Sequence, residues 1–89
     1  MIRYHIIFKG RVQGVGFRYQ VKILADELKI TGTIKNLYDL SVEAYVQGRK
    51  SQLDEFFKGL ENINFARIEN KNIEEVGLVT EENDFQIIY

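Results

Sequence analysis

The sequence contains no cysteine and no proline, and it has a single histidine among its 89 residues. Without cysteine the chain can form neither disulfides nor thiolate nucleophiles nor cysteine-based metal sites, and one histidine cannot build a histidine-rich metal site. No apolar run approaches the ~18 residues of a membrane span, and the first apolar run is too short for a signal peptide. We therefore expect a cytoplasmic protein that uses no metal and no cofactor.

Charge is nearly balanced, because twelve basic residues face thirteen acidic ones and the net charge is −1. A protein that binds nucleic acid or membrane surfaces in general would normally be clearly basic, so we expect neither partner. The length, with 45% hydrophobic and 28% charged residues, is typical of one globular domain, which we place at residues 1–89. An anion site in this chain would therefore have to be formed by a few groups at one place and not by the overall charge.

Apolar periodicity predicts five strands and two helices. The expected strands cover residues 3–12, 33–36, 41–47, 65–75 and 85–89. One helical apolar face is formed by Phe17, Val21, Leu24, Ala25 and Leu28. The other is formed by Leu53, Phe56, Phe57, Leu60 and Ile63. We expect the first helix to stop near Thr31 and Gly32, and Ser51 is the candidate N-cap of the second helix.

This order, βαββαβ with a short edge strand after it, predicts a fold of the α+β class. Two helices can cover one face of an antiparallel four- to five-stranded sheet, which is the ferredoxin-like α/β sandwich.

The stretch GRVQGVGFR, residues 10–18, places three glycines and two arginines between the first strand and the first helix. It is not a Walker A loop, because no Gly-Lys-Ser/Thr follows, and it is not a dinucleotide fingerprint, because Tyr19 occupies the third glycine position. A plain tight turn would account for one or two glycines but not for Arg18. We interpret the stretch as a nest of backbone N–H groups for a phosphate, with a forked guanidinium beside it. The residues assigned to this loop are Gln13, Gly14, Val15, Gly16, Phe17 and Arg18.

The same stretch resembles the signature of the acylphosphatase family, Gly-x-Val-Gln-Gly-Val-x-Phe-Arg, and matches it from Gly10 to Arg18. A second family segment, in which an asparagine precedes a turn and Val-Glu, corresponds to Gly32 through Glu43. The closing FQIIY is similar to the family pattern Phe-x-Ile-x-Tyr. The resemblance therefore extends over nearly the whole chain.

The resemblance implies hydrolysis of the carboxyl–phosphate anhydride of small acyl phosphates to a carboxylate and inorganic phosphate, without metal and without a phosphoenzyme. It assigns the two essential roles to Arg18 and Asn36. Such a substrate is already activated, so the enzyme needs to neutralise phosphate charge, for which Arg18 is suited, and to align a water, for which the Asn36 amide is suited. We expect a monomer whose partner is this small molecule.

Other interpretations of these residues have less support. Asn36 alone is more typical of a residue that initiates a turn. A non-catalytic phosphate- or acyl-phosphate-binding module on the same fold is the alternative to the enzyme. An RNA-binding module is disfavoured, because the segment SVEAYVQG lacks the basic-aromatic consensus of such sheets. His5 has no carboxylate partner that spacing suggests, so we expect it on a strand surface rather than in catalysis.

Three residues depart from the family pattern: Thr33 replaces an aromatic residue, Lys35 an arginine, and Leu40 a glycine after the aspartate of the turn. A positive φ at position 40 would cost leucine about 1–2 kcal/mol. We therefore expect a different turn type there.

Overall fold

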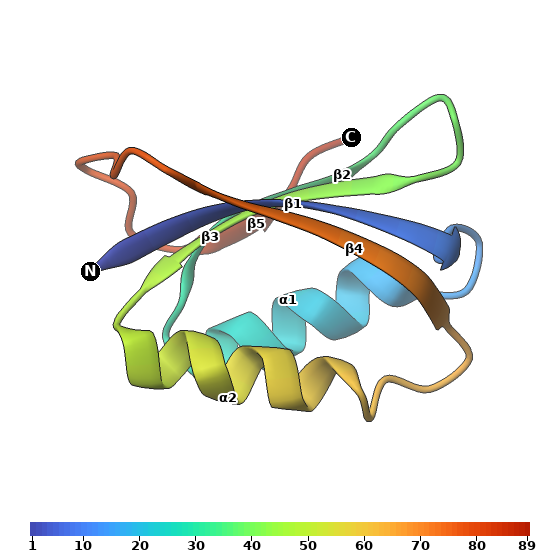
Figure 1. Cartoon of the computed structure of the whole chain (residues 1–89), viewed down its shortest axis with the longest axis horizontal. Coiled ribbons are helices and arrows are strands. Elements are labelled where there is room, and N and C mark those ends of the chain that lie inside the picture. Colours follow the sequence, from blue (N-terminus) through green and yellow to red (C-terminus); the bar gives the residue numbers. More distant parts are fainter.

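The computed structural model describes every residue from Met1 to Tyr89. Its elements are β1 (Ile2–Arg11), α1 (Phe17–Glu27), β2 (Thr31–Asn36), β3 (Val42–Gly48), α2 (Lys50–Leu60), β4 (Arg67–Val76) and β5 (Phe85–Ile87). The strands form one sheet in the order β4-β1-β3-β2-β5, and both helices lie against the same face of it (Figure 1). The predicted ferredoxin-like α+β fold is confirmed.

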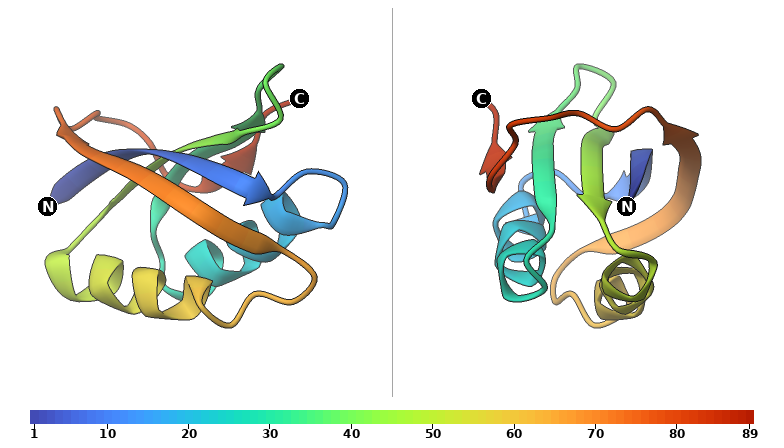
Figure 2. Two further views of the ribbon diagram at one scale, coloured as in Figure 1. Left: turned by 45° about the vertical axis from the view of Figure 1, so that its right-hand side comes forward. Right: turned by 90° about the vertical axis from the view of Figure 1, so that its left-hand side faces the viewer.

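One pairing in the sheet differs from the expected antiparallel arrangement. β5 pairs with β2 in parallel, with Gly32 opposite Phe85 and Ile34 opposite Ile87. The cause is the connection after β4, which crosses from one edge of the sheet to the other before β5 begins (Figure 2). This crossing brings the end of the chain beside the end of β2.

The core lies between the sheet and the helices. Alternate residues of the central strands point inward, among them Ile6 and Phe8 of β1 and Ala44 and Val46 of β3. Phe8 meets Phe17 of α1 edge to face, with ring centroids 5.1 Å apart. Phe17 is thus fixed in the core at the first position of its helix.

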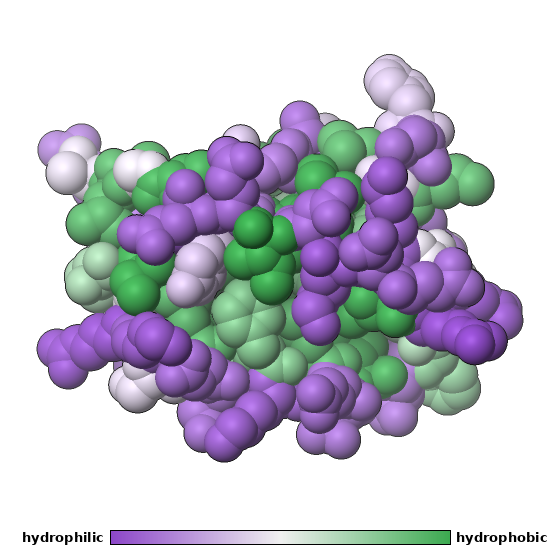
Figure 3. Space-filling model, in the orientation of Figure 1, coloured by the Kyte–Doolittle hydropathy of each residue, from purple (hydrophilic) through white to green (hydrophobic).

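Apolar side chains also form a band between β4 and α2 on the face drawn in Figure 3. A hollow of about 360 Å³ lies there, lined in part by Leu60, Ile63 and Ile68. None of the residues assigned to the phosphate loop from the sequence lines this hollow.

Two predicted helix ends were wrong. α1 stops at Glu27, and Lys29 takes a left-handed φ of 58°, so Thr31 and Gly32 already belong to β2. Gly32 is needed for another reason, since a Cβ there would lie 1.8 Å from the Tyr45 carbonyl oxygen of β3.

α2 begins at Lys50, with Arg49 and not Ser51 at the N-cap. The Arg49 N–H donates to the Gln52 side chain, with 2.6 Å between nitrogen and oxygen. This contact satisfies one of the free donors at the helix start, so a serine cap is not required.

Candidate active site

The loop between β1 and α1 is held by the core at both of its ends. Val12 and Phe17 are buried, while Gly14 and Gly16 take left-handed φ angles of 73° and 75°. A Cβ added at either glycine would meet no other atom of the chain within 4 Å. Backbone conformation, and not crowding inside the protein, therefore favours glycine at these two positions.

Free backbone donors line this loop and the first turn of the helix. None of the N–H groups from Gln13 to Tyr19 donates a hydrogen bond to another atom of the chain. These groups stand at the N-terminus of the 11-residue helix α1, where the helix dipole favours negative charge. The loop can therefore bind an anion through its backbone.

Arg18 follows directly in the first turn of α1. Its guanidinium carbon lies 5.1 Å from the centre of the Tyr89 ring, a cation–π distance, and no carboxylate of the chain pairs with it. The five N–H donors of its planar fork remain available to a ligand.

Asn36 is the last residue of β2, and its exposed side chain makes no hydrogen bond within the chain. It lines the same hollow, of about 190 Å³, as Arg18. The loop residues that line this hollow are Gln13, Gly14, Gly16 and Phe17. The structure thus brings together the two side chains that the resemblance assigned to catalysis.

Two residues of the predicted phosphate loop, Val15 and Gln13, differ from the others in where their side chains lie. Val15 does not line the hollow, because its side chain packs against the core. The Gln13 side-chain amide is directed to the β2–β3 hairpin, where it donates to the Leu37 carbonyl at 2.9 Å and to the Ser41 carbonyl at 2.8 Å. Only the backbone N–H of Gln13 is free for an anion.

Residues near the end of the chain complete the hollow, and reasoning from residue chemistry missed them. Ile87 and Tyr89 line it because β5 runs parallel to β2. Lys22 of α1 fastens this edge, since its ammonium group donates to the Phe85 carbonyl at 2.7 Å. The only signal in the sequence was the FQIIY pattern.

The expectation of a different turn type at Leu40 was wrong. Leu40 has a φ of 73°, so the turn keeps a left-handed residue at this position although the residue is leucine. Before it, Asp39 accepts hydrogen bonds from the Ser41 hydroxyl and from the Ser41 N–H, the latter at 3.1 Å. These contacts, with the charge of Lys9, hold the pKa of Asp39 below its ordinary 3.8. The tip is therefore anionic at neutral pH.

His5 lies outside the hollow, on the uncovered face of the sheet. Its Nε2 is 2.8 Å from a carboxylate oxygen of Glu43, a partner on β3 that the sequence spacing did not suggest. Elsewhere, Glu82 in the connection before β5 forms an ion pair with Arg3 at 2.9 Å.

No group of three or more histidine, aspartate or glutamate side chains lies close enough to hold a metal ion. None of the helices has both the length and the apolar character needed to cross a membrane.

Comparisons with known proteins all indicate one family. The protein-family model described as Acylphosphatase matches residues 4–87. An acylphosphatase of Treponema denticola is 47% identical over 81% of this chain and 78% of its own length. One from Geobacillus kaustophilus is 42% identical over 100% of this chain and 96% of its own. The crystal structure of acylphosphatase from Bacillus subtilis superimposes with a TM-score of 0.93 at 37% identity, with both chains covered completely.

Proposed function

The chain belongs to the acylphosphatase family, and we propose that the hollow between α1 and the end of β2 is its active site. The protein is a hydrolase of acid anhydrides that cleaves the carboxyl–phosphate bond of small acyl phosphates. The observation that carries the proposal is that Arg18 and Asn36, both without partners in the chain, line one hollow with the free N–H groups of the loop.

The phosphoryl group binds to the loop. Its non-bridging oxygens accept hydrogen bonds from the backbone N–H groups that follow Gln13 and from the fork of Arg18. These donors are fixed before substrate arrives, because Val12 and Phe17 anchor the loop in the core. A prearranged set of donors stabilises the charge on the equatorial oxygens in the transition state.

Asn36 orients the attacking water. The amide oxygen accepts a hydrogen bond from the water, and this contact fixes the position from which the water attacks. The water oxygen forms a bond to phosphorus on the side opposite the bridging oxygen. The bond from phosphorus to that oxygen breaks, its electron pair leaves with the carboxylate, and the water proton passes to solvent or to the phosphate formed.

No side chain in the hollow needs to act as a general base. The leaving carboxylate is a weak base, and the anhydride is activated before it binds. Arginine remains protonated and asparagine does not ionise, so charge stabilisation and alignment are the only contributions required of these two residues.

We also propose that the protein acts as a monomer, because Arg18, Asn36 and the free N–H groups of the loop already meet in one hollow within a single chain. Size-exclusion chromatography of the active enzyme should give a monomer of about 10 kDa, consistent with the chain mass of 10.4 kDa.

Hydrolysis of benzoyl phosphate, followed as loss of absorbance in the presence of EDTA, tests the site. Arg18→Ala should lower kcat/KM by roughly 10³-fold or more, and Arg18→Lys should recover little, because a point charge cannot replace the planar fork. Inorganic phosphate should inhibit the wild type competitively.

Arg49→Ala is the matched control, because Arg49 is exposed at the start of α2 and takes no part in the hollow. It should retain wild-type kinetics. Substantial activity in Arg18→Lys would contradict bidentate phosphate binding, and a rate that EDTA abolishes and Mg²⁺ restores would contradict a metal-free reaction.

A further inference from the structure

The side chain of Gln13 joins the phosphate loop to the end of the strand that carries Asn36, and we propose that Gln13 is a positioning residue for the hydrolysis. This inference rests on the proposed function, since it concerns the same site. It gives the Gln13 amide a role that differs from phosphate binding: the amide sets the distance between the loop and the water-orienting side chain.

The contact is made to both sides of the hairpin at once. One N–H of the Gln13 amide donates to the Leu37 carbonyl at 2.9 Å and the other to the Ser41 carbonyl at 2.8 Å. Both carbonyls also close the turn, because the Leu37 N–H donates to Ser41 at 2.9 Å and the Leu40 N–H donates to Leu37 at 3.2 Å. Gln13 therefore uses the remaining acceptor capacity of the two carbonyls at the base of the tip.

The hairpin depends on this contact more than the loop does. No residue from Lys35 to Ser41 belongs to the hydrophobic core, and Tyr38 and Leu40 at the tip are exposed. The loop, by contrast, is anchored by Val12 and by Phe17 in the core. If the two hydrogen bonds are lost, the segment that begins at Asn36 is the part that can shift.

Such a shift would affect turnover and not phosphate binding. Asn36 directly precedes Leu37, so displacement of the Leu37 carbonyl moves the amide that orients the water. A misplacement of about 1 Å can cost roughly 10²-fold in rate. Phosphate binding depends on the loop N–H groups and Arg18, neither of which is held by the Gln13 side chain.

The test is Gln13→Met, which keeps the length of the side chain and removes both donors. We expect kcat for benzoyl phosphate to fall by roughly 10- to 100-fold. The KM, and the inhibition constant of inorganic phosphate, should remain within about threefold of wild type, because binding interactions common to ground state and transition state are unchanged. A residue that only supported the fold would not separate kcat from these binding constants.

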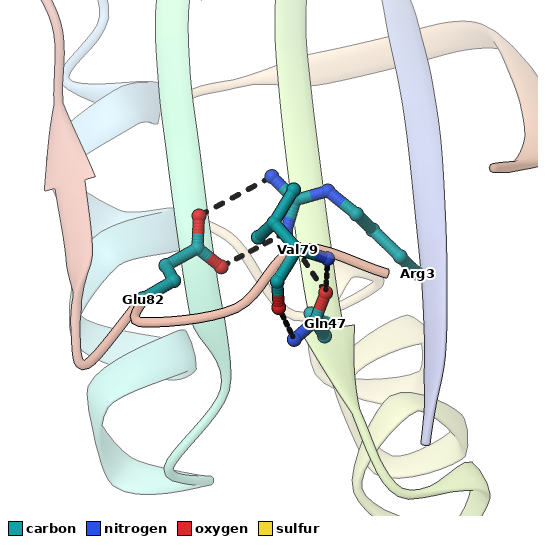
Figure 4. A network of polar contacts seen from close by, with 4 residues as sticks. All are labelled: Arg3, Gln47, Val79 and Glu82. Atoms are coloured by element: carbon teal, nitrogen blue, oxygen red, sulfur yellow. Dashed lines mark hydrogen bonds and ion pairs between the residues drawn. The ribbon is translucent and has the colours of Figure 1, made fainter. Parts of the chain in front are cut away.

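Gln47→Met is the matched control. Gln47 makes a clamp of the same kind at the opposite end of the sheet, donating to the Val79 carbonyl at 3.1 Å and accepting from the Val79 N–H at 3.0 Å (Figure 4). It also accepts from Arg3 at 3.2 Å. Gln47→Met should lower the thermal unfolding midpoint at least as much as Gln13→Met while kcat stays at the wild-type value.

Three outcomes would overturn the inference: wild-type kcat in Gln13→Met, a joint fall of kcat and phosphate affinity, or an equal fall of kcat in Gln47→Met. Circular dichroism confirms that the variants are folded. If Gln13→Met does not fold, Gln13→Asn takes its place in the same kinetic assays, with the same expected results. The shorter Asn amide cannot reach both carbonyls.

Arg18→Ala, assayed beside these variants, separates the two proposals. An active Arg18→Ala would remove the proposed phosphate site and the role of Gln13 with it. An inactive Arg18→Ala together with a normal Gln13→Met would remove only the role of Gln13.

Discussion

Replacement of Leu40 by glycine should make this protein more stable. Leu40 occupies the tip of the β2–β3 hairpin with a φ of 73°, a region in which a Cβ approaches the following carbonyl oxygen. The side chain is 67% exposed, so it contributes little burial in return for this conformation. Leu40→Gly removes the strain and leaves the backbone of the hairpin as it is.

The size of the effect follows from three contributions. Relief of the left-handed strain is worth about 1–2 kcal/mol. The greater freedom of glycine in the unfolded chain takes back about 0.4–1 kcal/mol, and loss of the mostly exposed side chain costs little. The difference between these contributions spans about 0–1.6 kcal/mol, and its middle value of about 0.8 kcal/mol corresponds, for a domain of this size, to a rise in Tm of about 3–6 °C.

Thermal unfolding followed by circular dichroism measures this gain, with Leu40→Ala as the control. Alanine removes most of the side chain and keeps the Cβ, so Leu40→Ala should show no rise in Tm. The kcat of Leu40→Gly should stay within about twofold of wild type, because Leu40 lines no part of the hollow. A Leu40→Gly protein no more stable than Leu40→Ala would refute the reasoning, since strain at position 40 would then contribute nothing.

Two further predictions concern the reaction. Asn36→Ala should lower kcat by roughly 10²-fold or more while inorganic phosphate still inhibits at the wild-type concentration, because the amide orients water and does not anchor phosphate; a collapse of both would mean that the roles are wrong. His5→Gln should retain the wild-type kcat and its plateau between about pH 5 and 7.5, because no histidine, aspartate or glutamate side chain lines the hollow. A folded but inactive His5→Gln would show that the mechanism lacks a component.

Sequence periodicity was sufficient to predict which helices and strands form, and insufficient to predict the residues at which they begin and end. The apolar face of α2 is a repeated feature, so the helix could be located, but its first residue is set by local contacts of Arg49 with Gln52 and Leu53. Serine is a common cap, which made Ser51 the reasonable choice. The predicted end of α1 is wrong for a similar reason: glycine is typical of a helix end, whereas at Gly32 it is the approach of Tyr45 from β3 that requires it.

The parts of the site differ in how far the sequence could define them. The loop and Arg18 are contiguous, so their composition alone indicated an anion site. Asn36 needed the family resemblance, because an asparagine before a turn has an ordinary explanation. The contact of Gln13 with the hairpin and the pair formed by His5 and Glu43 depend on strand register, which residue types do not reveal.

Leu40 and the loop glycines together indicate why the loop is built from glycine. Gly14, Gly16 and Leu40 have nearly the same φ, 73°, 75° and 73°, and at neither glycine would a Cβ meet another atom of the chain within 4 Å. The cost of a left-handed conformation is thus tolerated at the hairpin tip, so this conformation favours glycine at the two loop positions but does not by itself require it. The remaining difference is position, since both glycines line the hollow and Leu40 does not. A phosphate can approach the N–H groups of the loop directly only where the backbone that lines the hollow carries no side chains.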